Sequence, residues 1–98
     1  MITHVVSFRW KPETTVEQIG RIQAALESLP AAIVEIVSYS YGADLGVHGS
    51  ANMDFAIVAT FDSVEAWRVY DKHPEHDRVR TEIIRPCIAE RAAVQFHS

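Results

Sequence analysis

The chain has few residues of the kinds that mark secreted, membrane or nucleic-acid-binding proteins. Its 98 residues include a single cysteine, Cys87, which excludes an internal disulfide and gives no sign of an oxidising compartment. No apolar run reaches the ~18 residues of a membrane-spanning helix. The N-terminus lacks the charged start and the cleavage site of a signal peptide. We therefore expect a cytoplasmic protein without a membrane partner.

Positive charge is also scarce. Nine Lys and Arg residues stand against 13 Asp and Glu residues, and the formal net charge is −4. Arg78, Arg80 and Arg85 are interleaved with acidic residues and form no basic stripe, so we expect no nucleic-acid partner.

The glycines of the segment 42–49 do not have the spacing of a phosphate-binding loop, and no cofactor motif is present. No cofactor is expected.

The chain does contain enough apolar residues to form the core of one folded domain over residues 1–98. Hydrophobic residues make up 48% of the sequence, an ordinary value for a globular protein. A domain of this size buries only about 60–65% of the surface of its unfolded chain, so its margin of stability is modest. Association with a second copy would add to that margin.

Four segments have the pattern of β-strands and three have the pattern of helices. Side chains alternate between apolar and polar along residues 2–10 and 53–61, while 33–41 is rich in β-branched and aromatic residues. Apolar residues recur every three or four positions in two segments, one after Thr14 or Thr15 and one after Asp62 or Ser63, and in each pair either residue can cap the helix. We expect strands over 2–10, 33–41, 53–61 and 88–96, and helices over 15–29, 63–72 and 74–85, ended by Pro30, by the break before Pro74 and by Pro86.

This order of elements predicts an α+β, ferredoxin-like split βαβ fold, with a four-stranded antiparallel sheet covered by helices on one face. The other face carries small and apolar side chains, which we assign to Val5, Ala56, Val58, Ala89 and Ala93. Such a face on a small domain suggests that a second sheet packs against it. We therefore expect a homodimer through the open face of the sheet, that is, a dimeric α+β barrel.

The segment YDKHPEH, residues 70–76, holds the densest group of titratable side chains. Tyr70 follows Trp67 at helical spacing, His76 lies at the inner edge of the next helix, and His4 shares the inward face of the first strand. All three are directed into the layer between helices and sheet. His73, at the helix break, faces solvent or caps the next helix. A pocket there would be lined by Tyr70, His76, His4, Val6, Phe8, Trp67 and His73.

Each of these side chains alone has an ordinary structural explanation. A single inward histidine is commonly hydrogen-bonded to a backbone carbonyl in the core, and the hydroxyl of an inward tyrosine commonly contacts solvent. Three together resemble the few polar groups of a small-ligand pocket. The proline between His73 and His76 spoils a helical metal chelate, so no metal site is expected.

Proton transfer is the chemistry that such a trio suits. A histidine can take a proton near neutral pH, and a tyrosine hydroxyl can stabilise the enolate that forms when the proton lies next to a carbonyl. We therefore consider His76 as a general base and Tyr70 as an oxyanion stabiliser. Aldol or Claisen-type ring closure would follow from the same step.

The motifs HVVSFRW, GADLGVHGSANMDFAIVATFDS and YDKHPEH resemble the stress-responsive A/B barrel, or Dabb, family, over residues 2–97. The resemblance implies a dimeric α+β barrel. One plant relative, olivetolic acid cyclase, closes a linear polyketide, and by resemblance Tyr70 and His76 would act while His4 lines the pocket. The first helix offers aliphatic residues where that cyclase has aromatic ones, so the resemblance does not imply a polyketide substrate.

Three hypotheses follow from the sequence. The first is a dimeric barrel that binds a small apolar, phenolic or carbonyl compound without an assigned activity. The second is a cofactor-independent cyclase or isomerase that uses His76 and Tyr70. The third, by analogy with other barrels of this topology, is a cofactor-free monooxygenase or a haem-degrading enzyme.

Overall fold

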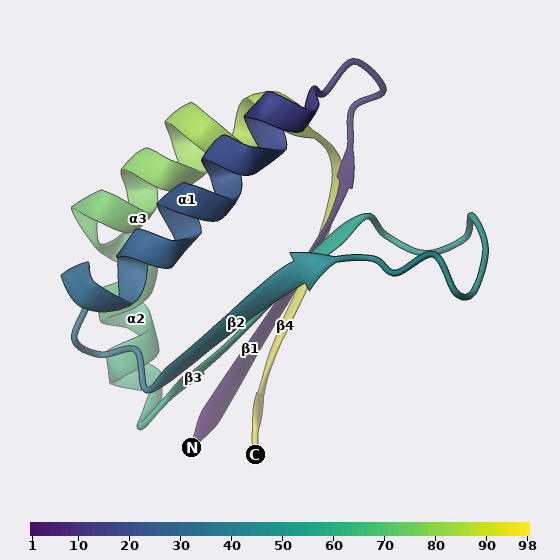
Figure 1. Cartoon of the computed structure of the whole chain (residues 1–98). Coiled ribbons are helices and arrows are strands. Elements are labelled where there is room, and N and C mark those ends of the chain that lie inside the picture. The colour runs from purple at the N-terminus through teal and green to yellow at the C-terminus, as the bar shows by residue number, and fades with distance from the viewer.

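A computed structural model describes all residues of the chain, from Met1 to Ser98. The strands and helices alternate as expected for a split βαβ fold (Figure 1). In chain order they are β1 (Ile2–Trp10), α1 (Val16–Ala32), β2 (Ser38–Ala43), β3 (Phe55–Phe61), α2 (Val64–Lys72), α3 (Pro74–Arg78), a π-helical segment (Val79–Ile84), a 3-10 turn (Arg85–Cys87) and β4 (Ile88–His97).

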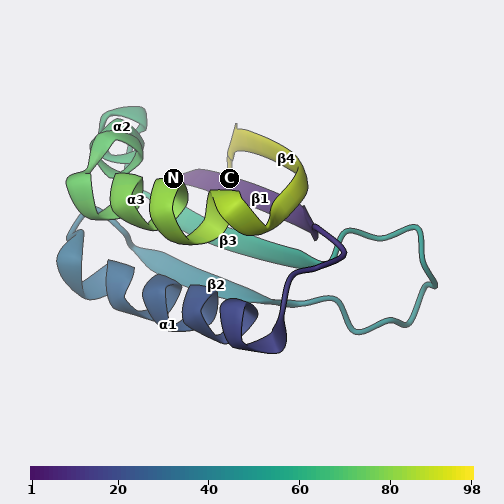
Figure 2. The same ribbon diagram turned by 90° about the horizontal axis from the view of Figure 1, so that it is seen from above.

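The four strands form one antiparallel sheet in the order β2-β3-β1-β4. Helices α1 and α3 lie side by side over one face of this sheet, with α2 near the end of the strands, and the other face carries no helix (Figures 1 and 2). The predicted ferredoxin-like fold is confirmed. The loop over residues 44–54, between β2 and β3, projects away from both layers.

The core lies between the helices and the covered face of the sheet. Alternation along β1 turns every second side chain inward, and β3 does the same over its whole length. From the helix layer, three fully buried residues of α1 meet these strands: Ile22, Leu26 and Leu29. The Thr15 side chain caps α1 and Gln18 completes the capping box, which fixes where this helix begins.

The structure corrects the predicted boundary between α1 and β2. Pro30 does not end α1, which continues to Ala32. The proline lies in the last turn, so few backbone hydrogen bonds follow it, and the Ile33 N–H still donates to the Leu29 carbonyl at 2.9 Å. Strand β2 begins at Ser38 and not at residue 33, because Ile33 is fully buried against the core as part of a turn.

The end of the last helix also differs from the prediction. Pro86 does not follow a regular α-helix but lies inside the 3-10 turn Arg85–Cys87. Before it, Val79–Ile84 is wound as a π-helix. Such widened turns are rare in proteins and are frequent at functional sites.

Beyond Ala89, the side chains of strand β4 face the opposite way from the prediction. Its register with β1 is regular from residue 97 to Glu90 and then shifts, so that Trp10 pairs with Ile88 and Ala89 is the extra residue of a bulge. Ala93 pairs with Val6 on the helix side, and was wrongly assigned to the open face. The open side of β4 carries Ala92, Val94 and Phe96 instead.

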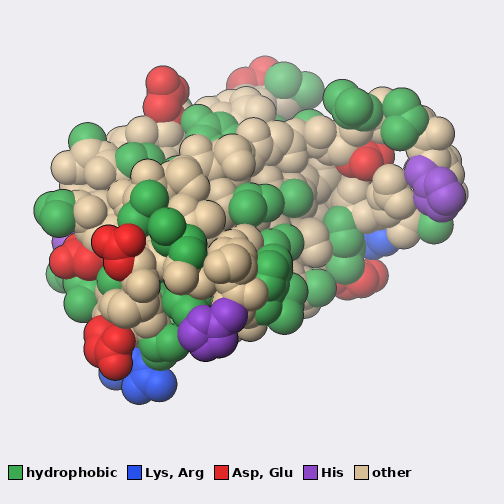
Figure 3. Space-filling model, turned by 90° about the horizontal axis from the view of Figure 1, so that it is seen from below, with side chains coloured by type: hydrophobic (Ala, Val, Ile, Leu, Met, Phe, Trp, Pro, Cys, Tyr) green, Lys and Arg blue, Asp and Glu red, His purple; other side chains and the backbone are tan.

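The open face of the sheet therefore has an apolar centre. Val58 on β3 and Val94 and Phe96 on β4 are exposed there, beside the small polar side chains of β2. Seen from the side away from the helices, hydrophobic side chains occupy the middle of the view, and most charged ones lie toward its margins (Figure 3). No helix of the chain has both the length and the apolar composition needed to cross a membrane.

Candidate active site

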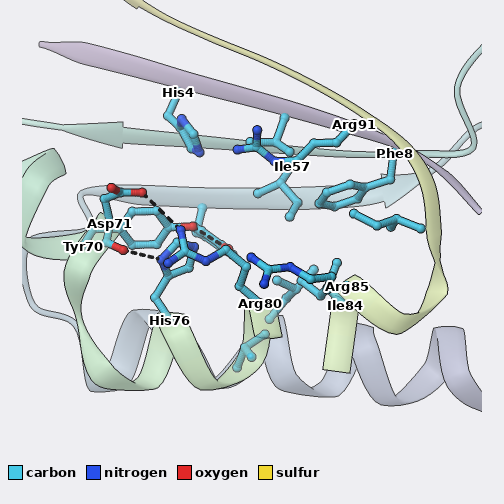
Figure 4. Close-up of a pocket in the computed structure, with 15 residues that line it drawn as sticks. His4, Phe8, Ile57, Tyr70, Asp71, His76, Arg80, Ile84, Arg85 and Arg91 are labelled. Carbon is cyan, nitrogen blue, oxygen red and sulfur yellow. Dashed lines mark hydrogen bonds and ion pairs between the residues drawn. The ribbon is translucent and has the colours of Figure 1, made fainter. Parts of the chain in front are cut away.

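A cavity of about 260 Å³ lies between the sheet and the helix layer (Figure 4). Strands β1, β2, β3 and β4 contribute to its walls, as do all three helices and the π-helical segment. Most of its lining is apolar, including Val6, Phe8, Leu26 and Ile57. The polar side chains that line it are His4, Tyr39, Tyr70, Asp71, His76, Arg80, Arg85 and Arg91.

The Tyr70 ring lies next to three other rings of the cavity, those of His4, Tyr39 and His76. It is only 2% exposed. The His76 ring stacks on it with 4.2 Å between ring centroids, and the His4 ring meets it edge-on at 5.9 Å. The imidazoles of His4 and His76, which lie 72 residues apart in sequence (76 − 4), thus contact one phenol.

His76 is held so that one ring nitrogen remains free. Its Nδ1 lies 3.1 Å from the main-chain carbonyl oxygen of Asp71. A carbonyl only accepts hydrogen bonds, so Nδ1 carries the proton and the lone pair of the neutral ring is on Nε2. Burial lowers the pKa of His76 below its ordinary value of 6.5, although the hydrogen bond to Asp71 opposes this shift. His76 is therefore a neutral base with an available lone pair near pH 7.

His4 has the opposite arrangement of its ring nitrogens. The amide of Gln95, on the neighbouring strand β4, donates to His4 Nδ1 at 2.9 Å. Because Nδ1 accepts, the neutral ring carries its proton on Nε2 and acts as a donor. Burial lowers the pKa of His4 from 6.5 to about 4, and the positive charge of Arg91 acts in the same direction.

Two phenols lie together beside the histidines. The hydroxyls of Tyr39 on β2 and Tyr70 on α2 are 3.3 Å apart. Burial raises the pKa of Tyr39, and burial also raises the pKa of Tyr70. Both phenols therefore keep their protons near pH 7. When one donates to the other, the second still has a hydrogen to donate to a ligand.

Charged side chains lie on the helix side and on the edge strand of the cavity. The Arg80 guanidinium is 3.5 Å from the Asp71 carboxylate and 3.0 Å from that of Asp77. Its Nε atom is buried without a hydrogen-bond partner. Arg85 and Arg91 are exposed and form no ion pair.

Comparison with known proteins identifies the family. The profile of the stress-responsive A/B barrel domain, Dabb, matches residues 2–98. The chain belongs to the Dabb family. A comparison with curated proteins found no match.

Solved structures share this fold over almost the whole Dabb chain. A dimeric ferredoxin-like protein of unknown function from Thermobifida fusca is 43% identical, with a TM-score of 0.91, over 99% of this chain and 90% of its own. A dimeric protein of unknown function from Bacteroides fragilis is 25% identical (TM-score 0.85; 99% and 95% covered). A hydroxynitrile lyase from Passiflora edulis is 24% identical (TM-score 0.86; 97% and 90% covered), and this last likeness shows the fold alone.

The Dabb structure places five of the seven expected site residues at the cavity: His4, Val6, Phe8, Tyr70 and His76. The other two do not line it. Trp67 borders a separate hollow of about 200 Å³ together with Ile2 and Phe96. The His73 ring is turned to the backbone, where its Nδ1 accepts a hydrogen bond from the Glu75 N–H at 3.1 Å and caps α3.

Sequence reasoning missed Tyr39, Asp71 and the three arginines of the cavity. Tyr39 was hidden because both faces of the second strand are apolar, so its inward face could not be chosen. Arg80 follows His76 by one helical turn, and that spacing is the signal that could have found it. Arg91 points to the cavity only because of the bulge in β4. No group of three or more His, Cys, Asp or Glu side chains is placed to hold a metal ion.

Proposed function

We propose that this Dabb domain binds a small carbonyl compound in the cavity and that His76 removes a proton from the carbon next to the carbonyl group. One observation carries the proposal: His76 lines the cavity and stacks on Tyr70, and the hydrogen bond from its Nδ1 to the Asp71 carbonyl leaves Nε2 unprotonated. The pKa of His76, lowered by burial, keeps this base unprotonated at neutral pH.

The proposed step needs only groups that line the cavity. The C–H bond next to the carbonyl breaks, its proton moves to His76 Nε2, and the electron pair becomes the enolate. The negative charge develops on the carbonyl oxygen, which accepts a hydrogen bond from the Tyr39–Tyr70 pair. The protonated His76 then returns the proton, which gives exchange or isomerisation, or the enolate attacks a second carbonyl group and closes a ring.

Deuterium exchange tests this step without knowledge of the natural substrate. We expect the protein to speed the exchange of methyl protons of 4-acetylbenzamide in D2O, followed by ¹H NMR. Removing a general base usually costs about 10²–10⁴-fold, so His76→Gln should lose most of the acceleration. His48→Gln, in the exposed loop 44–54, is the matched control and should keep it. Exchange at the buffer rate with the wild-type protein would contradict the proposal.

We also propose that two copies associate through the open face of the sheet. The exposed Val58, Val94 and Phe96 would be covered by the second sheet, and two Dabb-like structures are described as dimeric. Val94→Asp places a charge at the centre of this contact and should shift the protein from dimer to monomer in analytical ultracentrifugation. Val69→Asp, at a valine of similar exposure on α2 (46% against 53%), should leave the mass unchanged. A monomeric wild-type protein would refute this contact.

A further inference from the structure

The charge of the cavity is opposite to the charge of the whole chain. Its lining contains Arg80, Arg85 and Arg91 but only one acidic residue, Asp71. With neutral histidines, these side chains carry a formal charge of +2, whereas the chain carries −4. An excess of cations in one hollow of an acidic protein favours a negatively charged ligand.

The three arginines differ in the ion pairs that they form within the protein. Arg80 is paired with both Asp71 and Asp77, although its Nε has no partner. Arg85 and Arg91 have no carboxylate within ion-pair distance. Two guanidinium groups therefore remain available, one on the 3-10 turn and one on β4.

Burial divides the cavity into a floor and a mouth. His4 and Tyr70 are at most 5% exposed and form the floor, with the Tyr39 hydroxyl beside them. Arg85 and Arg91 are exposed and stand at the mouth. Figure 4 shows Arg91 reaching from β4 in the direction of His4, with Arg80 and Arg85 coming from the helix layer.

Irregular backbone around the mouth places these arginines at the cavity. The π-helical winding of Val79–Ile84 and the turn after it carry Arg80 and Arg85, and the bulge at Ala89 turns Arg91 inward next to Phe8. A regular strand starting from Ile88 would place Arg91 on the other face of the sheet. Three irregularities of the backbone, the π-helical segment, the 3-10 turn and the bulge, thus position the three arginines of the cavity.

We propose that the ligand of this cavity is a small carboxylate, bound with its carboxylate group between Arg85 and Arg91 at the mouth and its carbonyl group at the histidine and tyrosine floor. The inference rests on the proposed function and adds the substrate class to it. Guanidinium groups match carboxylates geometrically and bind them in pairs of hydrogen bonds. The cavity volume of about 260 Å³ lies just below the range of about 300–1,000 Å³ for drug-sized ligands, so the ligand is smaller than these.

A set of matched ligands tests the carboxylate. We compare 4-acetylbenzoate with the neutral 4-acetylbenzamide by isothermal titration calorimetry. The carboxylate should bind at least about tenfold more tightly. This factor corresponds to the lower end of the free energies of hydrogen bonds to charged groups, because both arginines are exposed. The preference should shrink as salt is added. Tighter binding of 4-acetylphenyl phosphate than of the carboxylate would overturn the assignment in favour of a phosphate.

Variants at the mouth locate the site. Arg85→Gln and Arg91→Gln should each weaken the binding of 4-acetylbenzoate about tenfold and leave that of the amide unchanged. Arg68→Gln, at an exposed arginine of α2 outside the cavity, should change neither. Three results would each overturn the inference. The wild type could bind both compounds equally well or bind neither, or the mouth variants could lose the same affinity for both.

The deuterium assay separates this inference from the proposed function. If the protein accelerates exchange of the acetyl methyl protons of 4-acetylbenzamide but binds 4-acetylbenzoate no more tightly, proton abstraction is supported and the anionic ligand is refuted. A carboxylate preference that depends on Arg91, without any exchange, would leave the anion site standing and refute the base role of His76.

Discussion

His4 should make the stability of the protein depend on pH. Its pKa in the folded protein is about 4, lowered from 6.5 by burial and by Arg91. Between these pH values the unfolded chain binds a proton that the folded chain does not. The stabilisation from the neutral ring is therefore complete above about pH 6.5 and is lost as the pH falls toward 4.

The size of this loss follows from the two pKa values. It amounts to about 2 kcal/mol at pH 5 and about 3 kcal/mol at pH 4, because one pKa unit corresponds to about 1.4 kcal/mol. Domains of this kind have unfolding free energies of about 5–15 kcal/mol. The protonation of one side chain would thus remove a large share of the stability.

Replacing His4 with glutamine isolates the effect. Glutamine can keep a hydrogen bond to Gln95 but has no proton to gain, so the His4→Gln protein should lose less stability on acidification than the wild type. We would measure urea unfolding at several pH values from about 4 to about 7, at one protein concentration, since association adds to apparent stability. His76, whose pKa is lowered too, is present in both proteins. A difference between the two proteins that stays constant over this range would refute a neutral, buried His4.

Three further results are expected. Ile22→Ala, at a fully buried position of α1, should lower the unfolding free energy in urea by about 2–5 kcal/mol, and a loss under 1 kcal/mol would show a looser core. Thr15→Ala removes the cap of α1 and should cost about 1 kcal/mol in the same assay, while Thr15→Ser should cost little. The acceleration of deuterium exchange should fall in acid with an apparent pKa below 6.5, and one well above 6.5 would exclude His76 as the base.

The fold was predictable because its strongest signals are local. Alternation in β1 and β3, a capping threonine before α1 and the break at Pro74 each depend on a few neighbouring residues. The structure has all of these features, although β3 begins at Phe55 and not at residue 53. The errors occur where packing outweighs local preference. Ile33 has the β-branched side chain of a strand residue but fills the core from a turn.

The site was predictable only in its buried half. The inward direction of His4, Tyr70 and His76 follows from the period of their strand or helix, and all three line the cavity. The arginines have no such signal, because an exposed charge fits almost any position. For Arg91 the period was misleading, since counting in twos from Ile88 crosses the bulge at Ala89 and exchanges the two faces of β4.

Strand β4 carries residues of both the proposed ligand site and the proposed dimer contact. Arg91 faces the cavity, and Val94, three residues later, faces the opposite side of the same sheet. If a carboxylate in the cavity strengthens the pairing of two copies by some factor, thermodynamic reciprocity requires pairing to strengthen the carboxylate's binding by the same factor. Protein concentration would then set the apparent affinity for the ligand, and a dilution series would reveal coupling that no single titration can.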